Sequence, residues 1–284
     1  MANISAADVK ALREKTGAGP MECKNALVET DGDFAKAEKL LKEKGLAAVE
    51  KRAGRATSEG KIFVNVKDNT AAVLVELASE TDFVARNPEF VALGEAIAKE
   101  AVEKGYSEPN DALNNMVTDL ASKIRENMSL KRLKMVTAAG GEYISSYIHG
   151  DGAIGITVKL GADKADAFQN EELKAFAFTL ALHVAAFNPA ALDQSKVDPA
   201  MLKEQEGIFR AQMEQDDKLQ GKPANVIDNI LKGKVSKFLK DISFMDQPYV
   251  KDEKMTVAQA VADAGKKAGA TISILDYVYF KVGE

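Results

Sequence analysis

The sequence predicts an α+β protein with a small N-terminal three-helix module, duplicated α+β core subdomains and a protruding antiparallel helical hairpin. Three observations support this class. Apolar residues recur at helical spacing up to about residue 50, and the period becomes strand-like at Lys61. The order of a strand, an Asp-containing turn, a second strand and a long helix then occurs twice. A pair of long helical patterns follows after residue 190.

These patterns predict a division of the chain into four units. The N-terminal helical module and its linker comprise residues 1–56, and the first core subdomain comprises residues 57–140. The helical hairpin comprises residues 190–244. Because the hairpin interrupts the second core subdomain, that subdomain is discontinuous and comprises residues 141–189 and 245–284.

Three short helices are expected in the N-terminal module. Ser5 and Asp8 have the spacing of a capping box at the start of the first helix, and TGAG (16–19) ends it. Asp33 can cap the third helix, on which four apolar side chains share one face: Phe34, Ala37, Leu40 and Leu41. The segment 50–60 that follows is small, charged and without a period, and we expect it to be a linker.

The two core subdomains are predicted from a repeated pattern. In the first copy, strand-like runs flank Asp68-Asn69, a pair that is typical of a hairpin turn. The second copy begins at 141–161, and in each copy an Asn opens the long helix that follows, at Asn87 and Asn170. The copies differ most before that helix, where the first contains the expected loop ETDFVAR (80–86). If the sheets are equivalent scaffolds, this segment is where function diverged.

Two antiparallel helices are expected in the hairpin. A cap followed by a proline predicts a helix over 198–218, and a turn at Gly221 leads into a return helix over 226–240. Because two helices bury little apolar surface alone, the hairpin must lie against the body or against another chain. A helix over 256–269 and a strand over 271–282 complete the second core subdomain.

The composition argues against two classes of partner. The net charge is -5, from 38 Lys and Arg against 43 Asp and Glu, so the chain lacks the basic character of a nucleic-acid-binding domain. No apolar run reaches the roughly 18 residues that a membrane span requires. The N-terminus also lacks the apolar stretch of a signal peptide. We therefore expect a cytoplasmic protein that binds neither nucleic acid nor membrane directly.

The sequence predicts no enzyme active site, no cofactor and no metal site. It contains no Gly-rich phosphate loop with an adjacent Lys, no nucleophile elbow and no paired-histidine zinc motif. Cys23 is the single cysteine and lies in a short predicted helix, which favours a buried thiol over a nucleophile. His183 lies mid-helix among apolar residues, which favours a core histidine. His149 lies at a hairpin turn, where a histidine is usually only solvated.

The segment 80–86 is the strongest candidate for a functional site. It connects the end of a strand to the cap of a helix, and no period buries the ring of Phe83. One interpretation is that Phe83 folds back as a hydrophobic staple onto the next helix. The other is that Phe83 is a wedge for a partner's pocket, where its burial would contribute about 1.5–3 kcal/mol. Asp82 would then bring a charge that competes at a cation or phosphate site.

Two segments of the chain closely resemble the signature stretches of the bacterial elongation factor Ts family. They are LREKTGAGPMECKNAL (Leu12 to Leu27) and ELASETDFVARN (Glu76 to Asn87), and the similarity extends over essentially the whole chain. The second stretch has Ala78 where the family usually has Asn. The resemblance implies a guanine-nucleotide exchange factor that binds the GTPase elongation factor Tu and promotes release of its GDP during translation elongation. The other classes considered are an adaptor that uses the N-terminal module and a thiol enzyme that uses Cys23.

The resemblance also implies which residues bind this partner. The exchange tip would be Thr81, Asp82, Phe83 and Val84, with Asp82 and Phe83 entering near the partner's nucleotide-bound magnesium. The N-terminal module, similar to the ubiquitin-associated fold, would dock on the GTPase domain through Lys10, Leu12, Arg13 and Met21. His149 would contact another part of the partner. The hairpin corresponds to the family's dimerisation element, which implies self-association through it.

Overall fold

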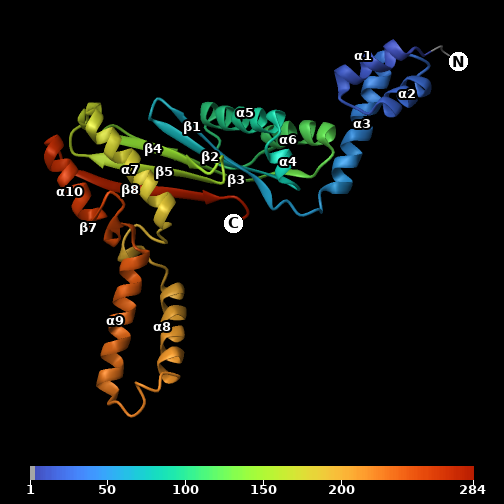
Figure 1. Ribbon diagram of the computed structural model, residues 1–284. Coiled ribbons are helices and arrows are strands. Elements are labelled where there is room, and N and C mark those ends of the chain that lie inside the picture. The colour runs from blue at the N-terminus through green and yellow to red at the C-terminus, as the bar shows by residue number, and fades with distance from the viewer. Residues whose placement is uncertain (1–3) are drawn as a thin grey trace.

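The body of the protein consists of two small antiparallel sheets with helices on their outer faces. The computed structural model describes residues 4–284. Figure 1 shows the three N-terminal helices at one end of an elongated molecule and the helical hairpin projecting from the other part of the body. The predicted α+β class, with its three-helix module, is confirmed. The exact boundaries of the four predicted units stay a prediction.

The N-terminal module consists of α1 (Ala6–Thr16), α2 (Pro20–Glu29) and α3 (Phe34–Arg52). The predicted capping box is present, because the Ser5 hydroxyl accepts from the Asp8 N–H and the Asp8 carboxylate accepts from the Ser5 N–H. The Asp33 carboxylate accepts from the Lys36 N–H and so caps α3 as predicted. A small core closes the module, made of Leu12, Cys23, Ala26, Leu27 and Ala37. The interpretation of Cys23 as a buried thiol is thereby confirmed.

The predicted linker is shorter than its sequence indicated. α3 continues through Arg52 and β1 begins at Glu59, which leaves residues 53–58 between them. Tertiary contacts account for the extension. Val49 packs against the core of the first sheet, and the Arg52 guanidinium donates to the carbonyl of Ala121 at 3.3 Å. A small, charged sequence therefore stays helical for as long as it touches the body.

The first sheet contains β1 (Glu59–Lys67), β2 (Ala71–Ser79) and β3 (Met128–Thr137) in that order. Asp68 and Asn69 both have a positive φ, as the predicted hairpin turn requires. One face of the sheet packs on α5 (Pro88–Lys104) and α6 (Asp111–Ile124). α5 can approach β1 closely because Gly94 has no side chain. A Cβ at this position would lie 2.1 Å from the Phe63 ring. The short helix α4 (Asp82–Ala85) lies between β2 and α5.

The second sheet repeats this arrangement with β4 (Glu142–His149), β5 (Ile154–Ala162) and β8 (Ile272–Lys281). α7 (Glu171–Phe187) and α10 (Val257–Ala268) cover its outer face. The repeated strand, strand and helix pattern of the sequence thus corresponds to two related three-stranded units. The sequence did not indicate the 3-10 turn Ala167–Gln169 or the small hairpin of β6 (Pro248–Tyr249) and β7 (Asp252–Thr256), because two- to five-residue elements are too short to show a period.

The inner faces of the two sheets pack against each other. Ile62 and Leu74 of the first sheet bury Phe280 of the second. Gly155 allows the approach, because a Cβ there would lie 2.4 Å from the Ile62 side chain. The Ile62 N–H also donates to the Gly152 carbonyl at 2.8 Å, which ties β1 to the β4–β5 turn. The body is therefore layered as helices, sheet, sheet and helices.

A buried carboxylate closes the same interface. Glu76 on β2 accepts from the Arg132 guanidinium at 2.6 Å and from the Gly283 N–H at 3.1 Å. Arg132 in turn donates to the Lys281 carbonyl at 2.9 Å and lies over the Phe280 ring at 4.1 Å. Both partners of this ion pair are thus hydrogen-bonded further, which offsets the cost of removing the Glu76 carboxylate from water, while Arg132 stays partly exposed. The end of β8 is held against the first sheet.

The hairpin consists of α8 (Pro199–Glu214) and α9 (Ala224–Ile242). α8 ends before the predicted residue 218, because Asp216 caps a turn by accepting from the Lys218 N–H. Phe209 and Phe238 pack edge to face across the pair at 6.2 Å. The two helices extend away from the body in Figure 1 rather than along it. Met201 and Ile208 remain exposed on α8.

His183 is buried in the core of the second sheet, as the sequence predicted. Its Nδ1 accepts from the Val250 N–H at 3.2 Å, so Nε2 carries the proton and donates to the Gln247 side chain at 2.9 Å. Burial lowers the pKa of His183, and the hydrogen bond to Gln247 partly opposes this shift. The neutral ring is therefore the form that the folded protein holds.

No helix among residues 4–284 has the length and apolar character of a membrane span.

The buried histidine predicts that stability decreases as the pH falls below about 6.5, the ordinary pKa of the side chain. Below that value the unfolded chain binds a proton at His183 that the folded chain excludes, so protonation favours unfolding. Thermal unfolding between about pH 7.5 and about pH 5.5 checks this expectation, with His183→Gln as the variant that cannot titrate. The Tm of the wild type should fall more than that of the variant. Equal falls would contradict a neutral buried histidine.

Candidate functional site

The segment 80–86 contains one helical turn, α4, and the prediction of a loop there was wrong. The Thr81 hydroxyl accepts from the Val84 N–H at 3.4 Å and acts as the N-cap. The Arg86 N–H donates to the Asp82 carbonyl at 3.1 Å and closes the turn. A Thr followed by Asp in the first turn is a favourable helix start. The sequence signal was present, but it was too short to show a period.

Phe83 points out of the molecule from this turn. Its side chain is 83% exposed, whereas Val84 and Ala85 are buried in the core of the first sheet. The staple interpretation is therefore wrong, because the Phe83 ring does not pack on α5. Val84 is an anchor rather than part of the exposed surface. On a single helical turn, burial of two consecutive residues leaves the preceding side chain on the solvent side.

Asp82 lies beside Phe83 and is half exposed. Its carboxylate is 3.3 Å from the Arg86 guanidinium, one turn further along. An exposed pair of this kind contributes about 0–1 kcal/mol, so a competing cation can take the carboxylate at little cost. α4 thus presents an aromatic ring and an available negative charge next to each other.

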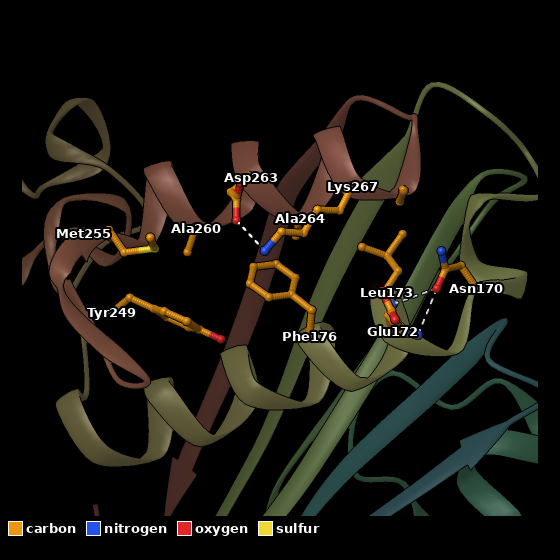
Figure 2. Close-up of a pocket in the computed structure, with 11 residues that line it drawn as sticks. Asn170, Glu172, Leu173, Phe176, Tyr249, Met255, Ala260, Asp263, Ala264 and Lys267 are labelled. Atoms are coloured by element: carbon orange, nitrogen blue, oxygen red, sulfur yellow. Dashed lines mark hydrogen bonds and ion pairs between the residues drawn. The ribbon is translucent and has the colours of Figure 1, made fainter.

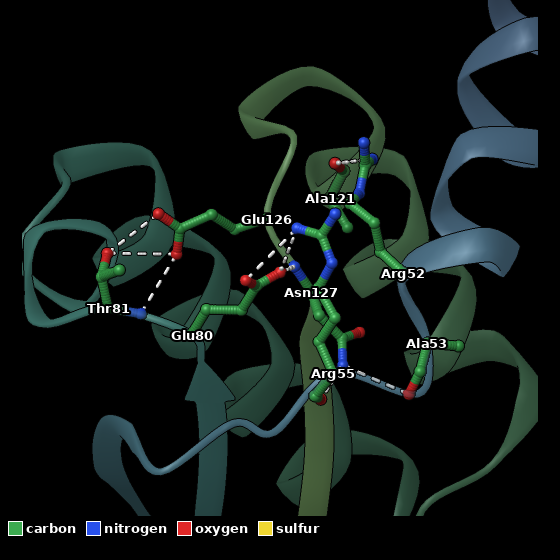
Figure 3. Close-up of polar contacts among 8 residues, drawn as sticks. All are labelled: Arg52, Ala53, Arg55, Glu80, Thr81, Ala121, Glu126 and Asn127. Carbon is green, nitrogen blue, oxygen red and sulfur yellow. Dashed lines mark hydrogen bonds and ion pairs between the residues drawn. The ribbon is translucent and has the colours of Figure 1, made fainter.

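The base of α4 is held by residues from the connection between α6 and β3 (Figure 3). Glu126 accepts from the Thr81 N–H at 3.1 Å and from the Thr81 hydroxyl at 2.9 Å. The Asn127 N–H donates to the Glu80 carboxylate at 2.6 Å. Neither Glu126 nor Asn127 stands out in the sequence. They are 45 and 47 positions from their partners, and no local pattern links them to α4.

The β4–β5 turn lies on the same side of the body as α4. Asp151 in this turn pairs with Lys61 of β1 at 2.7 Å. That ammonium group lowers the pKa of Asp151, and the charge of Arg86, at the end of α4, lowers it further. β1 thus connects the turn to α4, since α4 packs on β1 and β2. The structure brings together two segments that lie about 65 residues apart in the printed sequence.

His149 begins this turn and is exposed. Its Nδ1 is 3.0 Å from the Tyr147 hydroxyl, and the two rings are tilted 45° at a centroid separation of 5.9 Å. The tyrosine therefore holds the imidazole in a defined orientation at the surface. The expectation of an exposed turn histidine is confirmed; its role in binding stays a prediction.

The predicted docking residues of the N-terminal module separate into surface and core. Lys10 and Arg13 are exposed, and Met21 is 64% exposed. The structure corrects the prediction of Leu12 as a surface residue, because Leu12 has no exposed area and packs in the core of the module. Its contribution is to hold α1 in place. Figure 1 shows the module at the far end of α3 from α4, so this surface is separate from the tip.

A pocket of about 340 Å³ lies between α7 and α10 (Figure 2). Phe176 and Tyr249 contribute its aromatic lining. Most of its polar groups already have structural partners. Asn170 accepts from the Glu172 N–H at 2.9 Å and caps α7, and Lys267 pairs with Asp263 at 2.8 Å. Among residues 4–284, no group of His, Cys, Asp and Glu side chains is arranged to hold a metal ion.

Comparison with known proteins gives a consistent result. The model of the family "Elongation factor TS" matches residues 80–284. Elongation factor Ts of Treponema denticola is 49% identical over 281 residues, which are 99% of each chain. Elongation factor Ts of Treponema pallidum (strain Nichols) is 43% identical over 290 residues and 99% of each chain. That of Clostridium acetobutylicum is 39% identical over 293 residues, which cover 99% of this chain and 93% of the relative.

The exposure of Phe83 predicts that Phe83→Ala leaves the fold intact. Its free energy of unfolding should stay within about 0.5 kcal/mol of the wild type, as for other exposed side chains. Phe90, which is fully buried nearby on α5, provides the matched comparison. Phe90→Ala should lower the free energy of unfolding by about 3–5 kcal/mol. Urea unfolding measures both, and a large loss in Phe83→Ala would show that the ring packs in solution.

Proposed function

The chain belongs to the elongation factor Ts family, and from this membership we propose that it is a guanine-nucleotide exchange factor that binds the GTPase elongation factor Tu and promotes GDP release during translation elongation. The observation that carries this proposal is the geometry of α4. A phenyl ring that is 83% exposed stands beside an available carboxylate on a braced helical turn. Such a ring is suited to entering a partner, and the activity requires no covalent step from this chain.

Exchange is a problem of coupled binding. A nucleotide held at nanomolar affinity has a binding free energy of roughly -12 kcal/mol, so it leaves slowly by itself. The factor accelerates release if it binds the nucleotide-free GTPase more tightly than the nucleotide-bound form. By reciprocity, bound nucleotide then weakens the factor by the same ratio. A coupling of about 4 kcal/mol corresponds to a ratio of roughly a thousand.

We assign different parts of this work to Phe83 and Asp82. Phe83 enters between elements of the partner and separates them, and the burial of its ring contributes about 1.5–3 kcal/mol. Asp82 perturbs the water and magnesium network at the nucleotide, since Mg²⁺ in such sites keeps several waters and has few protein ligands. The hydrogen bonds of Thr81 hold the turn in this form before binding, so little ordering cost arises on association.

One exposed ring cannot supply a coupling of about 4 kcal/mol alone, so other surfaces must hold the partner. The position of His149 supports this, because its turn lies on the same side of the body as α4. The N-terminal module offers a second surface with Lys10, Arg13 and Met21 exposed. The partner would be held at both places while the tip acts.

The hairpin is proposed as a self-association element. Met201 and Ile208 leave apolar area exposed on α8, and the helices project from the body instead of packing along it. Burial of this area against a second copy would satisfy the requirement for a packing partner that a two-helix hairpin has.

Phe83→Ala should slow factor-dependent GDP release by roughly ten- to a hundredfold, which is the loss that about 1.5–3 kcal/mol of ring burial predicts. The measurement is stopped-flow release of fluorescent GDP from elongation factor Tu at several factor concentrations. Phe187→Ala serves as control, because it removes a part-exposed phenyl ring from the end of α7. The control should release GDP at the wild-type rate. An unchanged rate in Phe83→Ala would refute the wedge.

Removal of the hairpin should change the oligomeric state and leave GDP release per factor nearly intact. The structure indicates where to cut. Phe244 is buried in the second core and its N–H donates to the Ala191 carbonyl at 2.8 Å, so both must be kept. A deletion of 198–241 with a short Gly-Ser connection preserves them. Sedimentation of both forms checks the expectation, and identical assemblies would contradict it.

A further inference from the structure

Three consecutive residues in the connection between α6 and β3 each contact a different part of the molecule. Arg125 pairs with Glu22 of the N-terminal module. Glu126 binds Thr81 at the base of α4. Asn127 binds the linker that joins the module to the body. Because the three residues are adjacent in the chain, the contacts of all three parts meet on one short segment.

Glu126 holds the residue that begins α4. Its two carboxylate oxygens accept from the Thr81 N–H at 3.1 Å and from the Thr81 hydroxyl at 2.9 and 3.1 Å. Hydrogen bonds to an ionised acceptor are shorter and stronger than those between neutral groups. Thr81 is itself the N-cap of α4, so the carboxylate holds the residue that starts the turn. Phe83 therefore leaves the body in a direction that Glu126 helps to define.

Asn127 connects the linker to Glu80 through hydrogen bonds to both. Its buried side-chain amide donates to the carbonyls of Ala53 at 3.3 Å and of Arg55 at 2.7 Å. Its backbone N–H donates to the Glu80 carboxylate at 2.6 Å, and that carboxylate pairs with the Arg55 guanidinium at 3.3 Å. Figure 3 shows the linker, Glu80 and Asn127 converging at this point. Glu80 is the residue before Thr81, so the linker and the tip share one polar cluster.

Val49 of α3 packs on the first core, and much of the remaining junction between the module and the body is polar. A pocket of about 480 Å³ separates part of the module from α6, and charged side chains line much of it. The pairs across this junction, Arg125 with Glu22 and Lys42 with Asp119, are largely exposed, and exposed pairs contribute little to stability. The buried amide of Asn127 therefore acts together with Val49 and the Arg52 hydrogen bond in setting the position of the module relative to α4.

We infer that Glu126 and Asn127 are positioning residues, which hold the exchange tip and the N-terminal module at a fixed relative geometry for a partner that contacts both. This inference rests on the proposed function. Glu126 acts through Thr81 on Phe83, and Asn127 acts through the linker on the module. Removal of the Glu126 carboxylate increases the motion of α4, and removal of the Asn127 amide increases the motion of the module relative to the body.

The first test requires no partner. The chain contains no tryptophan, so Phe83→Trp provides a single fluorescent reporter on α4. In the isolated protein, adding Glu126→Ala should increase the amplitude of nanosecond local motion in the time-resolved anisotropy of the indole. Glu126→Gln keeps one acceptor oxygen for Thr81 and should give an intermediate amplitude. An unchanged anisotropy decay in folded Glu126→Ala would overturn the inference.

Glu142→Ala is the matched control for both tests. Glu142 also accepts from a backbone N–H, that of Ala139 at 2.7 Å, and pairs with Lys159 at 2.8 Å. It lies at the start of β4, and these two partners belong neither to α4 nor to the linker. Any change that this variant shares with Glu126→Ala reflects general loosening of the fold. A rise in indole motion of the same size in both would therefore overturn the role of Glu126.

The second test uses stopped-flow GDP release from elongation factor Tu as a function of factor concentration. Glu126→Ala should lower the maximal rate by about tenfold, a size typical of coupled neighbouring residues, with the half-saturating concentration little changed. Asn127→Ala should mainly raise the half-saturating concentration. In a Phe83→Ala background, Glu126→Ala should have almost no further effect on the maximal rate. Additive losses in the double variant would overturn the inference. If the wild-type factor itself does not accelerate GDP release, the proposed function is refuted, and the anisotropy result still stands.

Discussion

The packing between the inner faces of the two sheets is the constraint on which the rest of this structure depends. Ile62 and Leu74 bury Phe280 across the interface, and the Glu76–Arg132 pair holds the end of β8 against the first sheet. Each sheet has its own helices on the outside, so either unit could form its core separately. Only their mutual packing places the β4–β5 turn beside β1. Two candidate contact regions from different parts of the chain thereby face the same side.

The exposure of Phe83 follows from the burial of the two residues after it. Val84 and Ala85 are drawn into the first core, and on a helix of four residues this leaves the Phe83 ring in solvent. An exposed phenyl group is unfavourable in the isolated protein, but a turn that is already hydrogen-bonded leaves little to order if the ring enters a partner. Asp82 also needs little rearrangement to meet a cation, because its ion pair with Arg86 is exposed and weak. A one-turn helix is thus a better support for such a ring than a mobile loop.

The parts that project from the body are attached in different ways. The hairpin connects through short segments that are hydrogen-bonded into the second core, where Ala191 meets Phe244. The N-terminal module connects through α3 and a linker that Asn127 holds at two carbonyls. The first attachment combines backbone hydrogen bonds with the buried side chains of Ala191 and Phe244, and the second relies on the side-chain hydrogen bonds of Asn127. Polar contacts of this kind have a defined geometry, and the loss of one partner leaves a buried group unsatisfied at a cost of about 1–3 kcal/mol.

Local chemistry determined much of this protein in advance. The capping residues Ser5 and Asp33, the turn pair at 68–69 and the repeated strand, strand and helix order could all be recognised because each depends on neighbours within a few positions. The resemblance to the family signatures likewise indicated residues 81–84 as the candidate tip, although not that they form a helical turn. The tertiary structure alone decided that Phe83 is a projecting ring and not a staple, and that Leu12 belongs to a core. It also revealed Glu126, 45 residues from Thr81. Contacts between distant segments have no period in the sequence, because their geometry is set by how completed elements pack.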